Sequence, residues 1–187
     1  MFEARTIAFV GSGIMAEAMI KGLLRQGLVL PQQVVASGPR RERGQELFDR
    51  YQVRTTTDNV EAVRGADLVV LAVKPQVLSR VLEELSGAIG REILIISIVA
   101  GARMAAIQEK LGAAAVVRVM PNTPAQIGMG ISVWTATEVT TEVQRQQALA
   151  LLTALGEEVY VDDEGYLDMA TALSGTGPAY VFLLMEA

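Results

Sequence analysis

Residues 6–16 read TIAFVGSGIMA, and this stretch decides the fold. Residues 6–10 form a short apolar run that ends at a glycine turn, as expected for a buried β-strand. In the following residues 14–26, Met15, Met19 and Leu23 are spaced four apart, which indicates one apolar face of a helix. The stretch therefore predicts a strand, a tight glycine turn and a helix in direct succession.

The chain that follows alternates short apolar runs with amphipathic stretches. We expect strands at residues 33–37, 53–55, 67–73, 92–97 and 115–119, and helices at residues 40–51, 59–64, 76–85 and 104–111. The run DLVVLAV at residues 67–73 is typical of a strand that is covered on both faces of a parallel sheet. The pattern therefore predicts an α/β fold with a Rossmann-like, doubly wound and mainly parallel sheet.

The pattern changes after residue 119. We expect a further strand at residues 130–135, a helix over residues 142–155, a last strand at residues 158–161 and a helix over residues 163–173. Residues 174–187 (SGTGPAYVFLLMEA) resemble the beginning of another helix, with Thr176 or Gly177 as N-cap and Pro178 in the first turn. Residues 180–185 are apolar on every side, which is typical of a helix in an interior.

The composition narrows the possible chemistry. The 187 residues include no cysteine and no histidine, so we expect no disulfide, no thiolate or imidazole catalysis and no metal site. The net charge of −5 argues against a nucleic-acid partner. No apolar run approaches the ~20 residues of a membrane span, and there is no secretory signal pattern. We therefore expect a cytoplasmic protein without a membrane partner.

The glycine turn GSGIMA at residues 11–16 has the GxGxxA pattern of dinucleotide-binding sites, in the required position between a strand and a helix. Gly11 permits the tight turn, Gly13 lets the backbone approach a pyrophosphate, and Ala16 allows the helix and the strand to pack closely. The helix N-terminus offers free N–H groups to phosphates. We predict a bound dinucleotide; the alternative is a turn that merely needs small residues.

The end of the second strand indicates which dinucleotide is bound. NAD sites usually place Asp or Glu about 20 residues after the turn, to hold the ribose 2′-hydroxyl. Residues 35–41 (VASGPRR) contain no carboxylate there, but they contain Ser37, Arg40 and Arg41. Guanidinium groups bind phosphate in a charge-assisted way. We therefore predict NADP(H) in preference to NAD(H); the alternative is that both arginines form only a solvated helix start.

Six segments carry a resemblance to a known family. They are GSGIMAEAM (11–19), TTDN (56–59), LAVKPQ (71–76), ISIVAG (96–101), VRVMPNTPA (117–125) and LSGTGPAY (173–180). In this order and at this spacing they resemble pyrroline-5-carboxylate reductases over nearly the whole chain. The segments MPNTPA and SGTGPAY are far more specific than the glycine turn.

The resemblance implies a reaction and a domain organisation. NAD(P)H would reduce the C=N bond of 1-pyrroline-5-carboxylate to give L-proline, the last step of proline biosynthesis. Residues 1–162 would form the NAD(P)-binding domain, and residues 163–187 the beginning of an all-helical dimerisation domain of which most is missing from this chain. The intact protein would be a homodimer or a higher homo-oligomer.

The resemblance also assigns site residues. Cofactor contacts fall on Gly11, Ser12, Gly13, Ile14 and Met15 at the pyrophosphate, on Ser37 and Asn59 at the adenosine ribose, and on Ala72, Val73, Lys74, Pro75, Ala100 and Gly101 toward the nicotinamide. Met120, Pro121 and Asn122 fall near the reacting end and the substrate.

The catalytic residue stays unassigned, with Lys74 and Asn122 as candidates. Lys74 follows a buried strand at its carboxyl end, where open α/β sheets place their sites, but it could also only frame the cofactor. Asn122 lies between Pro121 and Pro124, where it contacts nicotinamide or substrate, or satisfies the backbone of its own loop. By resemblance, the decisive groups would lie in helices beyond this chain.

Two other functions stay open. One is a cofactor-binding fragment without turnover, because the substrate pocket would be incomplete. The other is a β-hydroxyacid dehydrogenase-like oxidoreductase, whose opening turn is similar. That family carries a catalytic lysine after a later glycine-rich segment, whereas no lysine follows Lys110 here, which argues against it.

Overall fold

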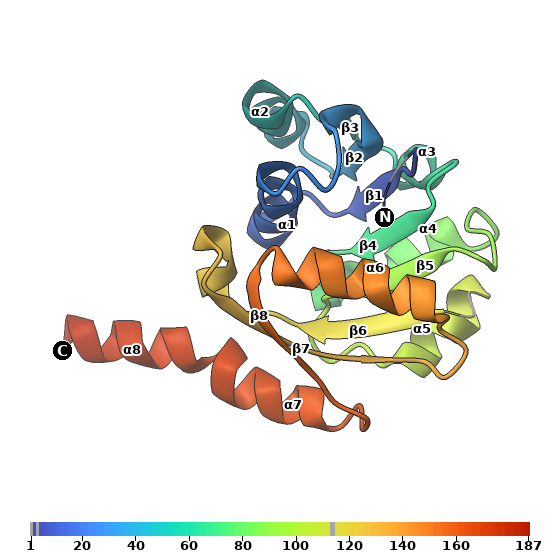
Figure 1. The fold of residues 1–187 in the computed structure, drawn as a ribbon. Helices are drawn as coiled ribbons and strands as arrows, with labels where there is room; N and C mark the ends of the chain where they lie inside the picture. Colours follow the sequence, from blue (N-terminus) through green and yellow to red (C-terminus); the bar gives the residue numbers. More distant parts are fainter. Residues whose placement is uncertain (1, 3, 113–114) are drawn as a thin grey trace.

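The computed structural model describes residues 2, 4–112 and 115–187. Strands and helices alternate along the chain as predicted, and their bounds differ from the expected ones by a few residues at most (Figure 1). The strands are β1 (Ile7–Val10), β2 (Val34–Ser37), β3 (Arg54–Thr56), β4 (Leu68–Leu71), β5 (Leu94–Ser97), β6 (Val116–Met120), β7 (Gly130–Ala136) and β8 (Gly156–Tyr160). The α-helices are α1 (Ile14–Arg25), α2 (Arg41–Tyr51), α3 (Asn59–Val63), α4 (Pro75–Leu85), α5 (Met104–Leu111), α6 (Glu142–Thr153), α7 (Tyr166–Ala170) and α8 (Gly177–Glu186).

All eight strands belong to one sheet, in the order β3-β2-β1-β4-β5-β6-β7-β8. Every neighbouring pair is parallel except β6 and β7, which confirms the doubly wound, mainly parallel sheet. The chain runs outward from β1 to β3 and then returns to the other side of β1 at β4. This reversal creates a switch point between β1 and β4, where the carboxyl ends of parallel strands leave a crevice.

Helices cover both faces of the sheet, and each face has its own apolar core. Along β1, Ile7 and Phe9 belong to the core under α1, α2 and α6, whereas Ala8 and Val10 belong to the core under α3, α4 and α5. Side chains alternate between the two faces of a strand, so a strand that is covered on both faces must be apolar throughout. This explains the continuous apolar runs in the sequence.

A buried arginine joins the sheet to α7. Arg118 on β6 is 3% exposed, and its guanidinium contacts the Glu164 carboxylate at 3.1 Å and the Asp168 carboxylate at 2.8 Å. The Glu164 carboxylate also accepts a hydrogen bond of 2.8 Å from the backbone amide of Met104, at the start of α5. One ion-pair cluster therefore holds β6, α5 and α7 together.

The helix expected over residues 163–173 starts three residues later than expected. The helix begins later, at Tyr166, because Glu164 is engaged with Met104 and Arg118, and Asp163 accepts a hydrogen bond of 2.8 Å from the Gly165 amide. Within the described residues, no group of three or more acidic side chains is arranged to hold a metal ion. No helix of the described part of the chain is long and apolar enough to cross a membrane.

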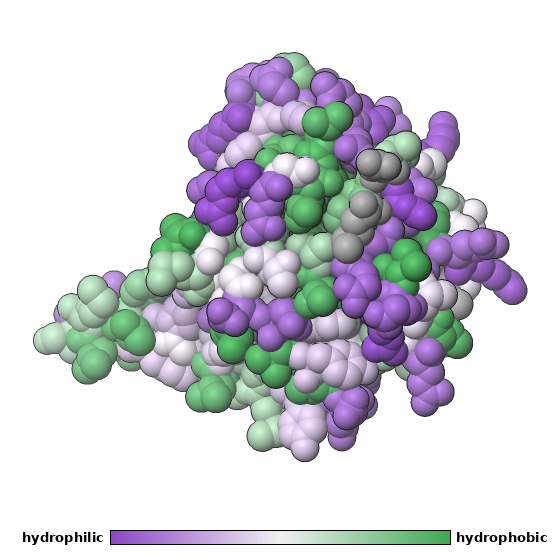
Figure 2. Space-filling view, viewed as in Figure 1, coloured by the Kyte–Doolittle hydropathy of each residue, from purple (hydrophilic) through white to green (hydrophobic). Residues whose placement is uncertain are grey.

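The last helix leaves the body of the molecule (Figure 1). A π-helical segment, η3 (Thr171–Gly175), links α7 to α8. Thr176 occupies the predicted N-cap position, but its hydroxyl donates back to the Thr171 carbonyl at 2.7 Å and does not cap α8. The apolar side chains of residues 180–185 are 54–78% exposed, and Figure 2 shows α8 as a projecting arm with apolar surface.

Candidate functional site

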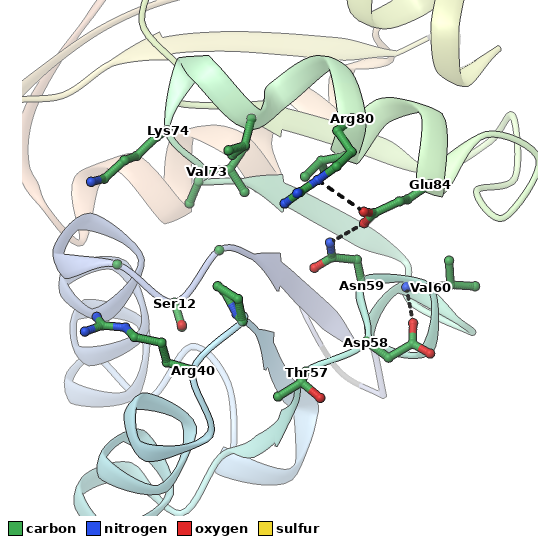
Figure 3. Close-up of a pocket in the computed structure, with 17 residues that line it drawn as sticks. Ser12, Arg40, Thr57, Asp58, Asn59, Val60, Val73, Lys74, Arg80 and Glu84 are labelled. Atoms are coloured by element: carbon green, nitrogen blue, oxygen red, sulfur yellow. Dashed lines mark hydrogen bonds and ion pairs between the residues drawn. The ribbon is translucent and has the colours of Figure 1, made fainter.

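A cleft of about 850 Å³ lies at the carboxyl edge of the sheet, at the switch point between β1 and β4 (Figure 3). The glycine turn forms its floor, the loop after β2 and the start of α3 form one wall, and α4 forms the other. Its lining residues are Gly11, Ser12, Gly13, Gly38, Pro39, Arg40, Thr57, Asp58, Asn59, Val60, Ala72, Val73, Lys74, Val77, Arg80, Val81 and Glu84. Open α/β sheets bind their ligands at this place.

Glycine is suited to the two positions of the turn for different structural reasons. Gly11 has a φ of +107°, and a Cβ there would lie 2.5 Å from the carbonyl oxygen of Ala72 in the loop after β4. Gly13 has an ordinary φ of −74°, and nothing lies within 4 Å of where its Cβ would be. Gly11 therefore allows the turn to pass close to β4, whereas Gly13 leaves the backbone open to a ligand.

The N-terminus of α1 is suited to binding an anion. Gly13 is the N-cap and has no side chain that could accept a hydrogen bond from the first-turn amides. Uncapped amides and the positive end of the helix dipole favour a phosphate group at this position. Ile14 is 63% exposed beside the turn, whereas Met15 packs against the core, and neither residue lines the cleft.

Arg43 on α2 holds the glycine turn from outside the cleft. Its Nε donates a hydrogen bond of 2.9 Å to the Ser12 carbonyl. The guanidinium is itself held by the carboxylates of Glu17 and Glu46. Glu17 also accepts hydrogen bonds from Arg50 at 2.9 Å and from the Tyr51 hydroxyl at 2.8 Å. This network, which the sequence did not reveal, fixes the carbonyl side of the turn so that its amides face the cleft.

The network shifts the pKa values of its members. Burial by itself would raise the pKa of the Glu17 carboxyl, but the hydrogen bonds from Arg43, Tyr51 and Arg50 outweigh it and hold that pKa below its usual value. Burial and the adjacent Glu17 carboxylate raise the pKa of Tyr51. Burial opposes the charge on Arg43, but Glu17 and Glu46 together raise its pKa. Glu17 is therefore an anion in the folded protein at neutral pH.

We expect Arg43→Gln to lower the free energy of unfolding at pH 7 by about 1–3 kcal/mol, because hydrogen bonds to charged groups are lost. In the wild type, a lowered Glu17 pKa contributes stability that is present above the unfolded pKa of 4.5 and is lost as pH falls through the folded pKa. Urea unfolding between pH 7 and pH 3 should therefore show a steeper loss for the wild type than for Arg43→Gln. Arg91→Gln, which changes an exposed arginine, is the control and should lose stability with pH as steeply as the wild type. An equally steep loss of stability with falling pH in Arg43→Gln and in Arg91→Gln would contradict the prediction.

At the end of β2, Ser37 lies beneath the cleft wall and is fully buried. Its hydroxyl donates to the amide oxygen of Asn59 at 2.8 Å, and the Asn59 nitrogen donates to the Glu84 carboxylate at 2.7 Å. Asp58 does not face this pair, because its carboxylate caps α3 by accepting from the amides of Val60 and Glu61. The predicted adenosine-ribose residues Ser37 and Asn59 are therefore in direct contact.

Arg40 and Arg41 are exposed at the start of α2, and no ion pair engages either guanidinium within the described ranges. Both line a hollow of about 330 Å³ beside the cleft, together with Thr55, Thr56 and Thr57. Arg40 also lines the cleft itself. The positive charge that a 2′-phosphate requires is therefore present at the end of β2.

The loop after β4 brings Ala72, Val73 and Lys74 into the cleft wall. Lys74 is the N-cap of α4 and Pro75 occupies its first turn. Lys74 is exposed, and no hydrogen bond or ion pair of the described residues holds its ammonium group. Ala100 and Gly101 follow β5 on the same edge of the sheet, outside the cleft lining.

The two most family-specific segments, MPNTPA and SGTGPAY, meet beside the carboxyl edge of the sheet. A Cβ on Gly175 would lie 2.6 Å from the terminal methyl of Met120, so the MPNTPA segment packs directly against the SGTG segment. The amide oxygen of Asn122 accepts a hydrogen bond of 2.9 Å from the Ile131 backbone. This contact ties the loop of Asn122 to β7. Neither Met120 nor Asn122 lines the cleft.

The sequence did not indicate that α4 forms a wall. Val77, Arg80, Val81 and Glu84 all line the cleft. These positions are three and four residues apart and thus share one helix face, which is the signal that could have identified them. Figure 3 shows Arg80 and Glu84 extending from α4 toward Asn59.

Comparisons with known proteins agree with this geometry. The family described as NADP oxidoreductase, coenzyme F420-dependent, matches residues 6–101. A pyrroline-5-carboxylate reductase of Pseudomonas aeruginosa is 44% identical over 97% of this chain and 66% of that protein. The solved structure of a pyrroline-5-carboxylate reductase from Coxiella burnetii has a TM-score of 0.91 and 35% identity over 97% of this chain and 68% of that chain. A pyrroline carboxylate reductase from Plasmodium falciparum, solved with NADP bound, has a TM-score of 0.87 and 27% identity over 100% of this chain and 68% of that chain. The chain thus spans about two thirds of the length of these relatives.

Proposed function

The chain belongs to the pyrroline-5-carboxylate reductase family, and from this we propose that it binds NADP(H) and takes part in the reduction of 1-pyrroline-5-carboxylate to L-proline. The observation that carries the proposal is the cleft at the switch point, with an open glycine turn and an uncapped helix N-terminus at its floor. The β-hydroxyacid dehydrogenase alternative has no comparable support, since no lysine follows Lys110.

The cleft residues fit a phosphorylated dinucleotide. The amides at the start of α1 would hold the pyrophosphate, because the N-cap residue Gly13 leaves them accessible and has no side chain to cap them. Arg40 and Arg41 would hold the 2′-phosphate beside Ser37 and Asn59. The loop with Ala72, Val73 and Lys74 would carry the other end of the cofactor along the strand ends.

When bound, the cofactor supplies the hydride for the C=N bond. The chain would orient it along the carboxyl ends of the strands. Met120 and Asn122 stay our candidates for the substrate end, and Lys74 and Asn122 stay candidates for a direct role at the reacting atoms. Lys74 is the stronger of these two, because its ammonium has no partner in the described structure whereas the Asn122 oxygen accepts a hydrogen bond from Ile131 on β7.

The proposal extends to the assembly and the compartment. Residues 163–187 would be the beginning of a helical dimerisation domain, and the exposed apolar side chains of α8 would be covered by helices of a homodimer or higher homo-oligomer. We also propose a cytoplasmic location.

The test is a fluorescence titration of the purified protein with NADPH, combined with an assay of NADPH oxidation driven by 1-pyrroline-5-carboxylate. Binding with turnover is the result expected of a complete reductase. Binding without turnover would support a cofactor domain that needs further helices. Absence of NADPH and NADH binding would overturn the proposal.

A further inference from the structure

Two carboxylates line the cleft: Asp58 caps α3, and Glu84 on α4 lies near the place where dinucleotide sites discriminate between NAD and NADP. That discrimination is made at the end of the second strand, where an acidic group accepts from the ribose 2′-hydroxyl or a cation holds the 2′-phosphate. No acidic residue stands there in the sequence. The structure brings Glu84 from α4 close to this place, with its Oε2 atom 2.7 Å from the side-chain nitrogen of Asn59, which in turn contacts Ser37 at the end of β2.

The two hydrogen bonds that link Ser37, Asn59 and Glu84 have a defined order of donors and acceptors. The buried Ser37 hydroxyl donates to Asn59 Oδ1 at 2.8 Å, and Asn59 Nδ2 donates to Glu84. A single amide group therefore separates the Glu84 charge from the last residue of β2. The Ser37 proton and one Asn59 proton are already engaged, so neither is free to donate to a phosphate.

The negative charge of Glu84 is only weakly compensated by an ion pair. Its partner is Arg80, one helical turn earlier, with Nε 3.5 Å from Glu84 Oε1. The Arg80 side chain is 71% exposed, and exposed ion pairs of this kind contribute little. Arg80 lines the cleft as well, so its guanidinium can leave Glu84 for a phosphate that enters beside Asn59.

From this arrangement we propose that Glu84 is a specificity-determining residue, which disfavours the 2′-phosphate and favours an unphosphorylated ribose, and that Arg80 opposes it. The proposal rests on the proposed function, because it concerns the adenosine end of the same dinucleotide site. It predicts that the chain accepts NADH alongside NADPH, although Arg40 and Arg41 supply positive charge nearby.

The experiment measures dissociation constants of the full chain for NADP⁺ and NAD⁺, and for the probes 2′,5′-ADP and 5′-ADP. Glu84→Gln keeps an acceptor for Asn59 but removes the charge. It should tighten NADP⁺ and 2′,5′-ADP by about tenfold, because a negative charge close to the phosphate is gone, and it should leave NAD⁺ unchanged or weaker. Arg80→Gln should act in the opposite direction and weaken NADP⁺.

Glu83→Gln is the matched control. Glu83 is the exposed neighbour of Glu84 on α4, carries the same charge and does not line the cleft. It should change each dissociation constant by less than about twofold, because exposed charges at a distance are screened. The gain from Glu84→Gln should also shrink in high salt.

Three outcomes are distinguishable. A selective gain for phosphorylated ligands in Glu84→Gln supports the proposal. Equal effects of Glu84→Gln and Glu83→Gln, or an unchanged NADP⁺ to NAD⁺ ratio in Glu84→Gln, overturn it while leaving the proposed function intact. If the wild type binds neither dinucleotide, the proposed function itself fails.

Discussion

Gly11→Ala is expected to lower the free energy of unfolding by about 3 kcal/mol or more and to abolish dinucleotide binding. A residue with a side chain at φ +107° is strained by about 1–3 kcal/mol. The new Cβ would also lie 2.5 Å from the Ala72 carbonyl oxygen, and such overpacking adds about 1–3 kcal/mol. Relief of the clash must move the loop after β4 away from the turn, which separates two parts of the cleft. Urea unfolding and NADPH titration measure the two effects.

Two other glycines are matched controls for Gly11. Gly27 has a φ of +66° but no atom within 4 Å of its Cβ position, so Gly27→Ala should cost only about 1 kcal/mol. Gly13→Ala should leave the stability almost unchanged and weaken dinucleotide binding, because its Cβ points into open space beside the pyrophosphate position. Equal unfolding midpoints for the Gly11 and Gly27 variants would refute the steric explanation.

Arg118→Met is expected to lower the free energy of unfolding by about 3 kcal/mol. Removal of one partner from a buried ion pair leaves the other charges uncompensated, which costs about 3–5 kcal/mol when the site is fully buried. Arg118 is 3% exposed, but Asp168 reaches solvent, so the lower end of that range applies. Chemical unfolding of the variant and the wild type measures the difference.

Two further variants show whether the loss of stability in Arg118→Met comes from uncompensated charges or from lost packing. In the triple variant Arg118→Met, Glu164→Gln and Asp168→Asn, no uncompensated charge is left, so part of the stability should return. Arg64→Met removes an exposed arginine and should change the stability by less than about 0.5 kcal/mol. If the triple variant is as unstable as Arg118→Met, the loss comes from packing instead.

The fold was predictable because its signals are local. The apolar runs that became β1, β4 and β5 are buried on both faces, so each is visible in a few consecutive residues. The glycine turn is equally local, since a strand, the turn and a helix follow one another directly. The resemblance to a family added the residues at the ends of the other strands.

The groups that tune the site were not predictable, because their partners are far apart in the sequence. The Arg43 guanidinium meets the Ser12 carbonyl only when α2 packs beside α1. Glu84 reaches Asn59 only because α3 and α4 lie side by side in the fold. The Arg118 side chain is charged in an otherwise apolar strand. No neighbouring residue in the sequence indicates that Glu164 and Asp168 are its partners.

The position of β1 has a consequence for synthesis on the ribosome. β1 leaves the ribosome before every other strand, but it lies between β2 and β4. Once β2 has emerged, one edge of β1 is paired, while the other edge waits for residues 68–71, with which it forms a full parallel ladder. An unpaired apolar edge is a template for association with other chains. The nascent chain therefore carries an unpaired apolar edge on β1 until β4 has emerged, and this edge then passes to β4 and to β5 until the next strand pairs with each of them.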